Sequence, residues 1–264
     1  MSNLALRILF GSLYVGVIIS CLFFKSPYFE CLMALAIFFS VREIALLTPK
    51  NTLHQTWIIP TTLGLIVAPF IGLEIKSVDL TVLVVLWMLQ VICLAISYVE
   101  LKKNTRLHYG SLSLYLFVPL FSLALWFNLE DVNHSMYLLF YFVTVWTYDS
   151  MAYVVGKLIG KRPIFPSVSP KKTIEGTIGG TLLTAIILFG LNLFWFHLNE
   201  NALILVCTIV FFAIWGDFIE SYMKRKIGIK DSGNLIPGHG GILDRMDSIY
   251  LSILPYLVIL ELFN

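Results

Sequence analysis

The stretch Ser221–Asp247, SYMKRKIGIKDSGNLIPGHGGILDRMD, lies between two long apolar segments and decides how the chain is organised. Hydrophobicity falls there, and four of the seven positions 224–230 are basic. Asp244 and Asp247 follow three residues apart, so a helix would place both on one face. Cations and carboxylates gathered at the end of an apolar segment suggest a place for phosphates and a divalent metal.

The overall composition is that of a membrane protein. The chain has 264 residues, of which 58% are hydrophobic and 13% are charged. Soluble domains carry about 25% charged residues. We therefore expect an integral membrane protein that forms one helical domain over residues 1–264, with N-terminal helices in 1–130 and a motif-bearing catalytic half in 135–263.

Apolar runs long enough to cross a bilayer recur along the chain. They predict an all-α, polytopic fold with about nine transmembrane helices, near residues 4–24, 28–47, 55–73, 78–98, 110–128, 135–158, 173–197, 201–223 and 243–263. Arg42 and Glu43 interrupt the second of these runs.

Lysine and arginine are distributed unevenly between the two sides of such a bundle. Of the 18 basic residues, all but Lys25 and Lys76 fall at the N-terminus or in connections on the same side. The positive-inside rule then places the N-terminus in the cytoplasm and the C-terminus outside. The charged stretch 221–247 accordingly faces the cytoplasm.

Asp149 lies within the sixth apolar run, where an acid is costly and is a functional candidate by default. Tyr153, Gly156 and Gly160 follow at helical spacing and share its face. We interpret Asp149 as a metal ligand or as a group that orients substrate. The alternative is a purely structural pairing with a nearby lysine or arginine.

The segment 169–180, SPKKTIEGTIGG, has the pattern of a helix start. Ser169 can cap a helix whose first residue is Pro170. Lys171 and Lys172 would then join free backbone N–H groups in an anion site. Two glycines in G-x-x-x-G spacing favour close helix packing. The alternative is a basic flank that only sets the topology.

Asp217, Glu220 or Ser221, and Lys224 recur at three- and four-residue intervals on an otherwise apolar helix. Such a stripe is expected to face the protein interior or a wet cavity. Its order, acid first and base second, suits a metal site followed by a phosphate clamp. Internal pairing of the acids with the lysine is the alternative.

Two aspartates in LDRMD (243–247) suit Mg²⁺, which usually takes one or two carboxylates and completes its shell with water and phosphate. The preceding Gly240 and Gly241 would let the backbone approach a ligand closely. His239 is a candidate acid–base group or ligand, although a polar loop histidine is more often neither.

Several familiar catalytic motifs are absent from the sequence. It contains no G-x-x-x-x-G-K-[ST], G-x-S-x-G or H-E-x-x-H motif, which argues against a P-loop ATPase, a serine hydrolase and a zincin. The residues instead predict an enzyme with an acid-lined, cation-rimmed site at the cytoplasmic membrane boundary. Such a site suits metal-assisted phosphoryl or nucleotidyl transfer to a lipid.

Residues 221–247 resemble the signature of the phosphatidate cytidylyltransferase (CDP-diglyceride synthase) family, S-x-x-K-R-x-x-x-x-K-D-x-G-x-x-x-P-G-H-G-G-x-x-D-R-x-D, at every specified position. Upstream, D-S-x-A-Y-x-x-G (149–156) and S-P-K-K-T-x-E-G (169–176) also look like the family's, with Ser150 where threonine is frequent. The first five spans match only as apolar helices, so no roles are carried over to them.

The resemblance implies that CTP and phosphatidate give CDP-diacylglycerol and pyrophosphate. It implies a magnesium-containing metal centre held by Asp217, Asp244 and Asp247, with Asp149 as a further member and room for a second cation. It implies that Lys224 and Arg225, which would hold phosphates, are catalytic residues together with these three aspartates. It also implies further groups that bind phosphate or substrate: Lys171, Lys172, Ser221, Lys230, Asp231, His239, Gly240, Gly241 and Arg245. We expect CTP, phosphatidate and membrane lipids as partners, no nucleic acid, and a bacterial inner-membrane location, with a homodimer left open.

Two other functions remain as alternatives. One is a different CTP-using membrane enzyme, either a lipid-alcohol kinase or a synthase that acts on another lipid phosphate. The second is a transporter with charged groups at a midplane site. The clustering of charges at one face, in the second half of the chain, argues against the transporter.

Overall fold

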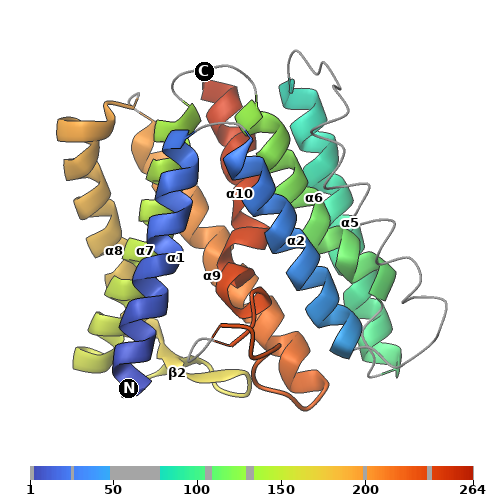
Figure 1. The fold of residues 1–264 in the computed structure, drawn as a ribbon. Helices are drawn as coiled ribbons and strands as arrows, with labels where there is room; N and C mark the ends of the chain where they lie inside the picture. The colour runs from blue at the N-terminus through green and yellow to red at the C-terminus, as the bar shows by residue number, and fades with distance from the viewer. Residues whose placement is uncertain are drawn as a thin grey trace.

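Long helices make up most of the structure (Figure 1). The computed structural model describes residues 3–24, 27–47, 78–104, 109–128, 134–198, 201–236 and 240–263. The expected span 55–73 lies outside the described residues. The other eight expected spans each coincide with a helix: α1 (Asn3–Phe24), α2 (Tyr28–Leu47), α5 (Leu80–Asn104), α6 (Tyr109–Asn128), α7 (His134–Ile159), α8 (Ile174–Leu191), α9 (Ala202–Lys226) and α10 (Leu243–Phe263).

Six of the described helices are long and apolar enough to cross a membrane: α5, α6, α7, α8 with the π-helical turn η2 (Asn192–Phe196) that extends it, α9 and α10. Large apolar side chains are exposed along α5 and α8, among them Met88 and Ile186. A bilayer would cover such side chains, whereas water would not stabilise them. The structure therefore supports a polytopic membrane protein.

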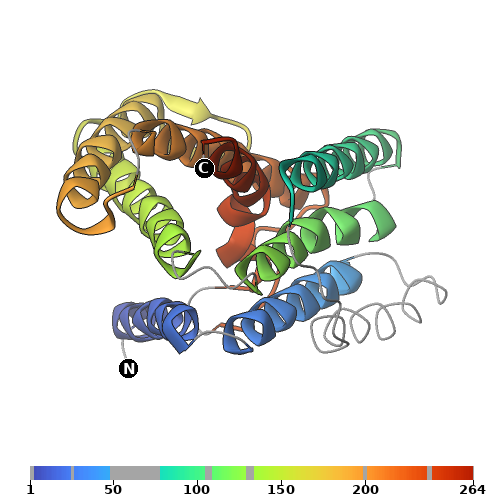
Figure 2. The same cartoon turned by 90° about the horizontal axis from the view of Figure 1, so that it is seen from above.

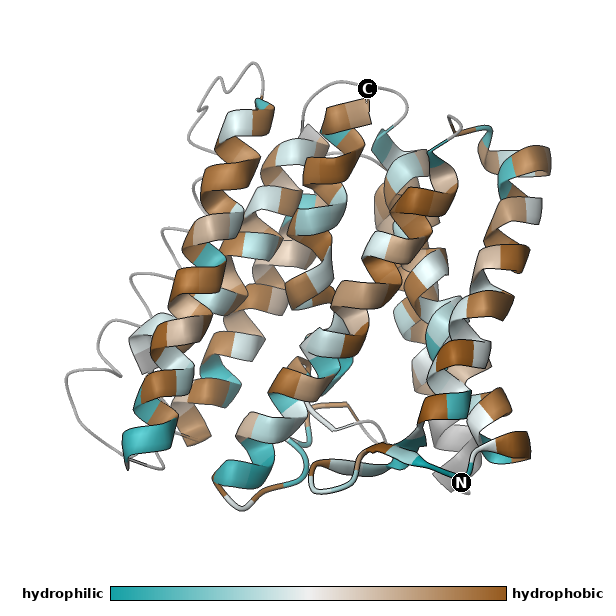
Figure 3. Cartoon of the chain, turned by 180° about the vertical axis from the view of Figure 1, so that it is seen from behind, coloured by the Kyte–Doolittle hydropathy of each residue, from teal (hydrophilic) through white to brown (hydrophobic). Residues whose placement is uncertain are grey.

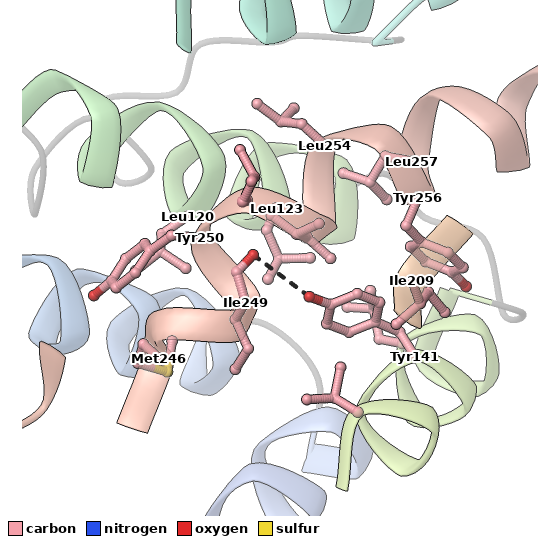
Figure 4. Close-up of a cluster of buried hydrophobic side chains, with 14 of the residues drawn as sticks. Leu120, Leu123, Tyr141, Ile209, Met246, Ile249, Tyr250, Leu254, Tyr256 and Leu257 are labelled. Carbon is pink, nitrogen blue, oxygen red and sulfur yellow. Dashed lines mark hydrogen bonds between the residues drawn. The ribbon is translucent and has the colours of Figure 1, made fainter. Parts of the chain in front are cut away.

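Helix α10 lies at the centre of the bundle. Figure 2 shows it between the α7–α8–α9 group and the α2–α5–α6 group, and it contacts members of both. The Tyr141 hydroxyl on α7 pairs with Ser252 Oγ at 2.6 Å and reaches the Ile249 carbonyl of α10 at 3.5 Å (Figure 4). These bonds pair buried polar groups of α7 with those of α10.

Helices α7 and α8 approach closely because small residues line their contact. A Cβ atom added at Gly176 would lie 2.8 Å from the Ala152 carbonyl oxygen, and one at Gly180 would lie 2.6 Å from Ala152 Cα. Only glycine fits at these positions without separating the helices. The close packing expected from the G-x-x-x-G spacing is confirmed.

A two-stranded hairpin joins α7 to α8, and it corrects one prediction. Strands β1 (Pro163–Phe165) and β2 (Ser169–Thr173) pair antiparallel. The helix start expected at Ser169 and Pro170 is therefore wrong: α8 begins at Ile174, with Thr173 as its N-cap, whose Oγ1 accepts the Gly176 N–H at 3.1 Å. Lys171 and Lys172 consequently lie on an extended strand and not in a first helical turn.

Polar residues concentrate at one end of the bundle. Figure 3 shows the hydrophilic colours gathered at the end that holds the hairpin and the start of α1. The C-terminus lies at the opposite end (Figure 1). The basic hairpin and the α9–α10 connection, which are separate in sequence, are thereby brought to the same end.

Candidate active site

A cleft of about 420 Å³ opens between α7, β2 and the start of α8. Its lining includes Asp149, Lys157, Lys171 and Lys172, so one carboxylate faces three ammonium groups. Ligand pockets typically measure roughly 300–1,000 Å³. The cleft is large enough for a polyphosphate, and its charge suits one.

Lys172 connects this cleft to helix α9 through an ion pair between its Nζ and Asp217 Oδ2. The other oxygen of Asp217 accepts the Ser221 hydroxyl at 3.2 Å. Lys172 and Asp149 both line the cleft. Two of the predicted metal ligands and a predicted phosphate ligand therefore meet in one place, although internal ion pairing is also present.

Lys224 lies at the centre of a second, more deeply buried group. Its Nζ is 2.6 Å from Asp244 Oδ1 and 3.2 Å from Glu220 Oε1, and all three side chains are at most 10% exposed. Apart from this ion pair, the Glu220 oxygens have no hydrogen-bond partner in the described part of the chain. The polar stripe predicted on α9 faces the protein interior, as expected.

Asp244 holds the connection between α9 and α10. Its carboxylate accepts the Ser232 N–H at 2.9 Å and the Gly241 N–H at 2.8 Å, in addition to the Lys224 ammonium. Gly240 has a φ of 86°, and a Cβ atom there would collide with the same carboxylate. Glycine is therefore required at this position by both backbone conformation and space.

Glu43 on α2 holds the same connection from its other side. Its carboxylate accepts the Ile242 N–H at 2.9 Å, the Leu243 N–H at 3.0 Å and the Ser232 hydroxyl at 2.9 Å. The sequence marks Glu43 only as an interruption of an apolar run. This charged residue within an apolar run was the sequence signal for a role of Glu43, because burying an acid there costs free energy unless it has partners.

Asp247 lies where α9 and α10 cross. A Cβ atom added at Gly216 would be 2.6 Å from the Asp247 carbonyl oxygen, so glycine permits the close approach. Asp247, Glu220 and Lys224 line a small cavity of about 20 Å³, which is room for about one water molecule. Asp247 is thus adjacent to the buried group around Lys224.

The remaining predicted residues are more peripheral. The Arg225 guanidinium donates to the Ile229 carbonyl at 2.8 Å. Lys230, Asp231 and Arg245 are exposed. His239 lies outside the described residues.

The carboxylates can be compared with what a divalent cation requires. The described residues include no group of three or more His, Cys, Asp or Glu side chains arranged to hold a metal. Mg²⁺ needs only one or two carboxylates. Asp217 and Asp244 are both engaged by a lysine ammonium, from Lys172 and Lys224 respectively. Asp217 also accepts the Ser221 hydroxyl, and Asp244 also accepts backbone N–H groups.

Comparisons with known proteins agree with the chemistry of this site. Residues 5–263 match the model of the cytidylyltransferase family. A phosphatidate cytidylyltransferase of Staphylococcus epidermidis is 38% identical over 170 residues, which are 63% of this chain and 65% of the relative. A relative of the same name from Staphylococcus aureus is 37% identical over 171 residues, which are 63% of this chain and 65% of the relative. Another from Staphylococcus haemolyticus is 46% identical over 127 residues, which are 47% of this chain and 48% of the relative. The chain spans about 65% of the length of the first of these relatives.

Proposed function

Because this chain belongs to the cytidylyltransferase family, we propose that it transfers the cytidylyl group of CTP to phosphatidate, giving CDP-diacylglycerol and pyrophosphate. The observation that carries the proposal is the lysine-lined cleft of about 420 Å³, joined through Lys172 to Asp217 at one end of an apolar bundle. Such a site can accept a nucleotide from water and a lipid phosphate from the bilayer.

In the proposed reaction, a phosphate oxygen of phosphatidate attacks the α-phosphorus of CTP. The bond from that phosphorus to the oxygen bridging the α- and β-phosphates breaks, and pyrophosphate leaves in line with the attacking oxygen. The ammonium groups of Lys157, Lys171 and Lys172 offset the repulsion between the two anionic substrates. Lys172 is 43% exposed, so a substrate phosphate can compete with Asp217 for it.

Mg²⁺ is the cofactor that we propose. Asp217, Asp244 and Asp247 would hold it, with Asp149 as a further candidate, and a second cation remains a prediction. A bound Mg²⁺ supplies charge neutralisation at the phosphates. The chain's own carboxylates contribute the ligands, and its lysines orient the substrate phosphates.

We also propose that the chain crosses a bacterial inner membrane nine times, with its N-terminus and active site in the cytoplasm. The asymmetric distribution of basic residues supports this orientation, since the basic hairpin and the α9–α10 connection lie at the same end of the bundle (Figure 3). CTP would then reach the site from the cytoplasm. Assembly as a homodimer stays a prediction.

The test is turnover by the purified protein with labelled CTP, phosphatidate and Mg²⁺, with EDTA as a control. Labelled CDP-diacylglycerol is expected, and a lipid alcohol or another lipid phosphate is expected to replace phosphatidate poorly. Asp247→Asn should abolish turnover while the protein remains inserted. Lys226→Ala, at an exposed position off the signature, should retain it. Turnover of Asp247→Asn like that of the unaltered protein would contradict the assignment of Asp247.

A further inference from the structure

Glu43 is a buried acid from the N-terminal helices whose contacts lie within the signature stretch. Its side chain is on α2 and is 4% exposed. Its three hydrogen-bond donors are Ser232, Ile242 and Leu243, which follow it by 189 to 200 positions. Helix α2 thereby contacts the connection that carries the predicted substrate-binding loop.

Ser232 links Glu43 to the catalytic candidates. Its hydroxyl donates to Glu43 Oε2, and its backbone N–H donates to Asp244. Asp244 in turn accepts the Lys224 ammonium. A continuous set of hydrogen bonds therefore runs from α2, through the loop, to the last turn of α9.

The loop backbone is built closely around the Glu43 carboxylate. A Cβ atom added at Gly233 would lie 3.0 Å from Glu43 Oε1, and one at Gly241 would overlap the carboxylate. Both glycines belong to the signature stretch. Their lack of a side chain is thus explained in part by the space that Glu43 occupies.

A carboxylate suits this position better than an amide. It offers two acceptor oxygens with about four lone-pair sites, enough for three donors. The N–H groups of Ile242 and Leu243 lie at the start of α10, where the helix dipole favours a negative charge. Glutamine would keep one acceptor oxygen and turn an NH₂ group toward a donor.

We propose that Glu43 is a positioning residue, which fixes the α9–α10 connection so that Asp244 holds Lys224 and α10 presents Asp247. The kinetic part of this inference rests on the function proposed above. Glu43 acts through the loop and through Ser232, not by contact with a substrate. A role limited to stabilising the bundle is the competing explanation.

Glu43→Gln and Glu30→Gln form a matched pair for the test. Glu30 is on the same helix and is 2% exposed, and its carboxylate oxygens have no hydrogen-bond partner among the described residues. Hydrogen exchange of the purified protein is measured over peptides covering 230–246, together with kcat and KM for CTP. Glu43→Gln should speed exchange of the loop amides roughly 10- to 100-fold and lower kcat/KM about 10- to 100-fold. Glu30→Gln should change neither quantity.

Ser232→Ala provides a second variant if Glu43→Gln does not fold, because it removes one donor and leaves both backbone bonds to Glu43. It should produce a smaller change in the same direction. Unchanged loop exchange in Glu43→Gln would overturn the inference, as would faster exchange with unchanged kcat/KM or an equal loss of kcat/KM in Glu30→Gln. Absence of turnover in the unaltered protein would contradict the proposed function, and the exchange comparison would still decide whether Glu43 holds the loop.

Discussion

Replacing Lys224 with methionine should destabilise the protein strongly. The ammonium is buried between the carboxylates of Asp244 and Glu220, at 2.6 and 3.2 Å. Methionine fills similar space without charge, so both acids lose their counter-ion. Removing one member of a buried ion pair typically costs about 3–5 kcal/mol. Each kcal/mol lowers the melting temperature of a chain of this size by about 2–4 °C, which predicts a decrease of roughly 6–20 °C.

The assay is thermal unfolding of the detergent-purified protein, and Lys226→Met is the matched control. Lys226 is exposed, and its Nζ lies 5.5 Å from the Tyr222 ring centroid, a contact that contributes about 0.5–1 kcal/mol. Adding Glu220→Gln to Lys224→Met should recover part of the lost stability, because one uncompensated charge disappears. If Lys224→Met melted within error of Lys226→Met, the buried ion pair could not be an important stabilising contact.

Two further substitutions test close backbone approaches by the same melting measurement. Gly180→Leu should lower the free energy of unfolding by about 1–3 kcal/mol, because the new side chain forces α8 away from α7. Gly190→Leu, on the same helix, places its side chain in open space and should lower it little. Similar melting temperatures for the two variants would contradict the tight α7–α8 contact. Gly240→Ala and Gly228→Ala both place alanine at a positive φ, yet only Gly240 faces a carboxylate, so its variant should be less stable by about 1–3 kcal/mol. Equal losses would mean that backbone strain alone matters at Gly240.

The positions of the helices could be predicted from the sequence. The expected spans 201–223 and 243–263 match the observed α9 and α10, both of which are long and apolar enough to cross a membrane. An apolar run bounded by polar residues determines a membrane helix nearly by itself, because lipid allows no unpaired backbone groups. The inward-facing stripe on α9 followed from the same local periodicity.

The hairpin and the role of Glu43 could not be predicted in this way, because both depend on contacts that are not local. Ser169 was the expected N-cap, but residues 169–173 pair with β1, with Phe165 opposite Ser169 and Pro163 opposite Thr173. The helix therefore begins only after Thr173. Glu43 meets its partners across more than 180 positions. Nothing in its immediate sequence indicates which segment supplies the donors.

The Glu43 contacts also bear on where this protein could be divided. A chain that began after residue 130 would contain the complete signature and yet lack the acceptor for the Ser232 hydroxyl and for the Ile242 and Leu243 N–H groups. Each buried donor without an acceptor costs about 1–3 kcal/mol. The segment that carries the motif is therefore not an autonomous module. Recombination or truncation that separates it from α2 would remove a structural part of its own loop.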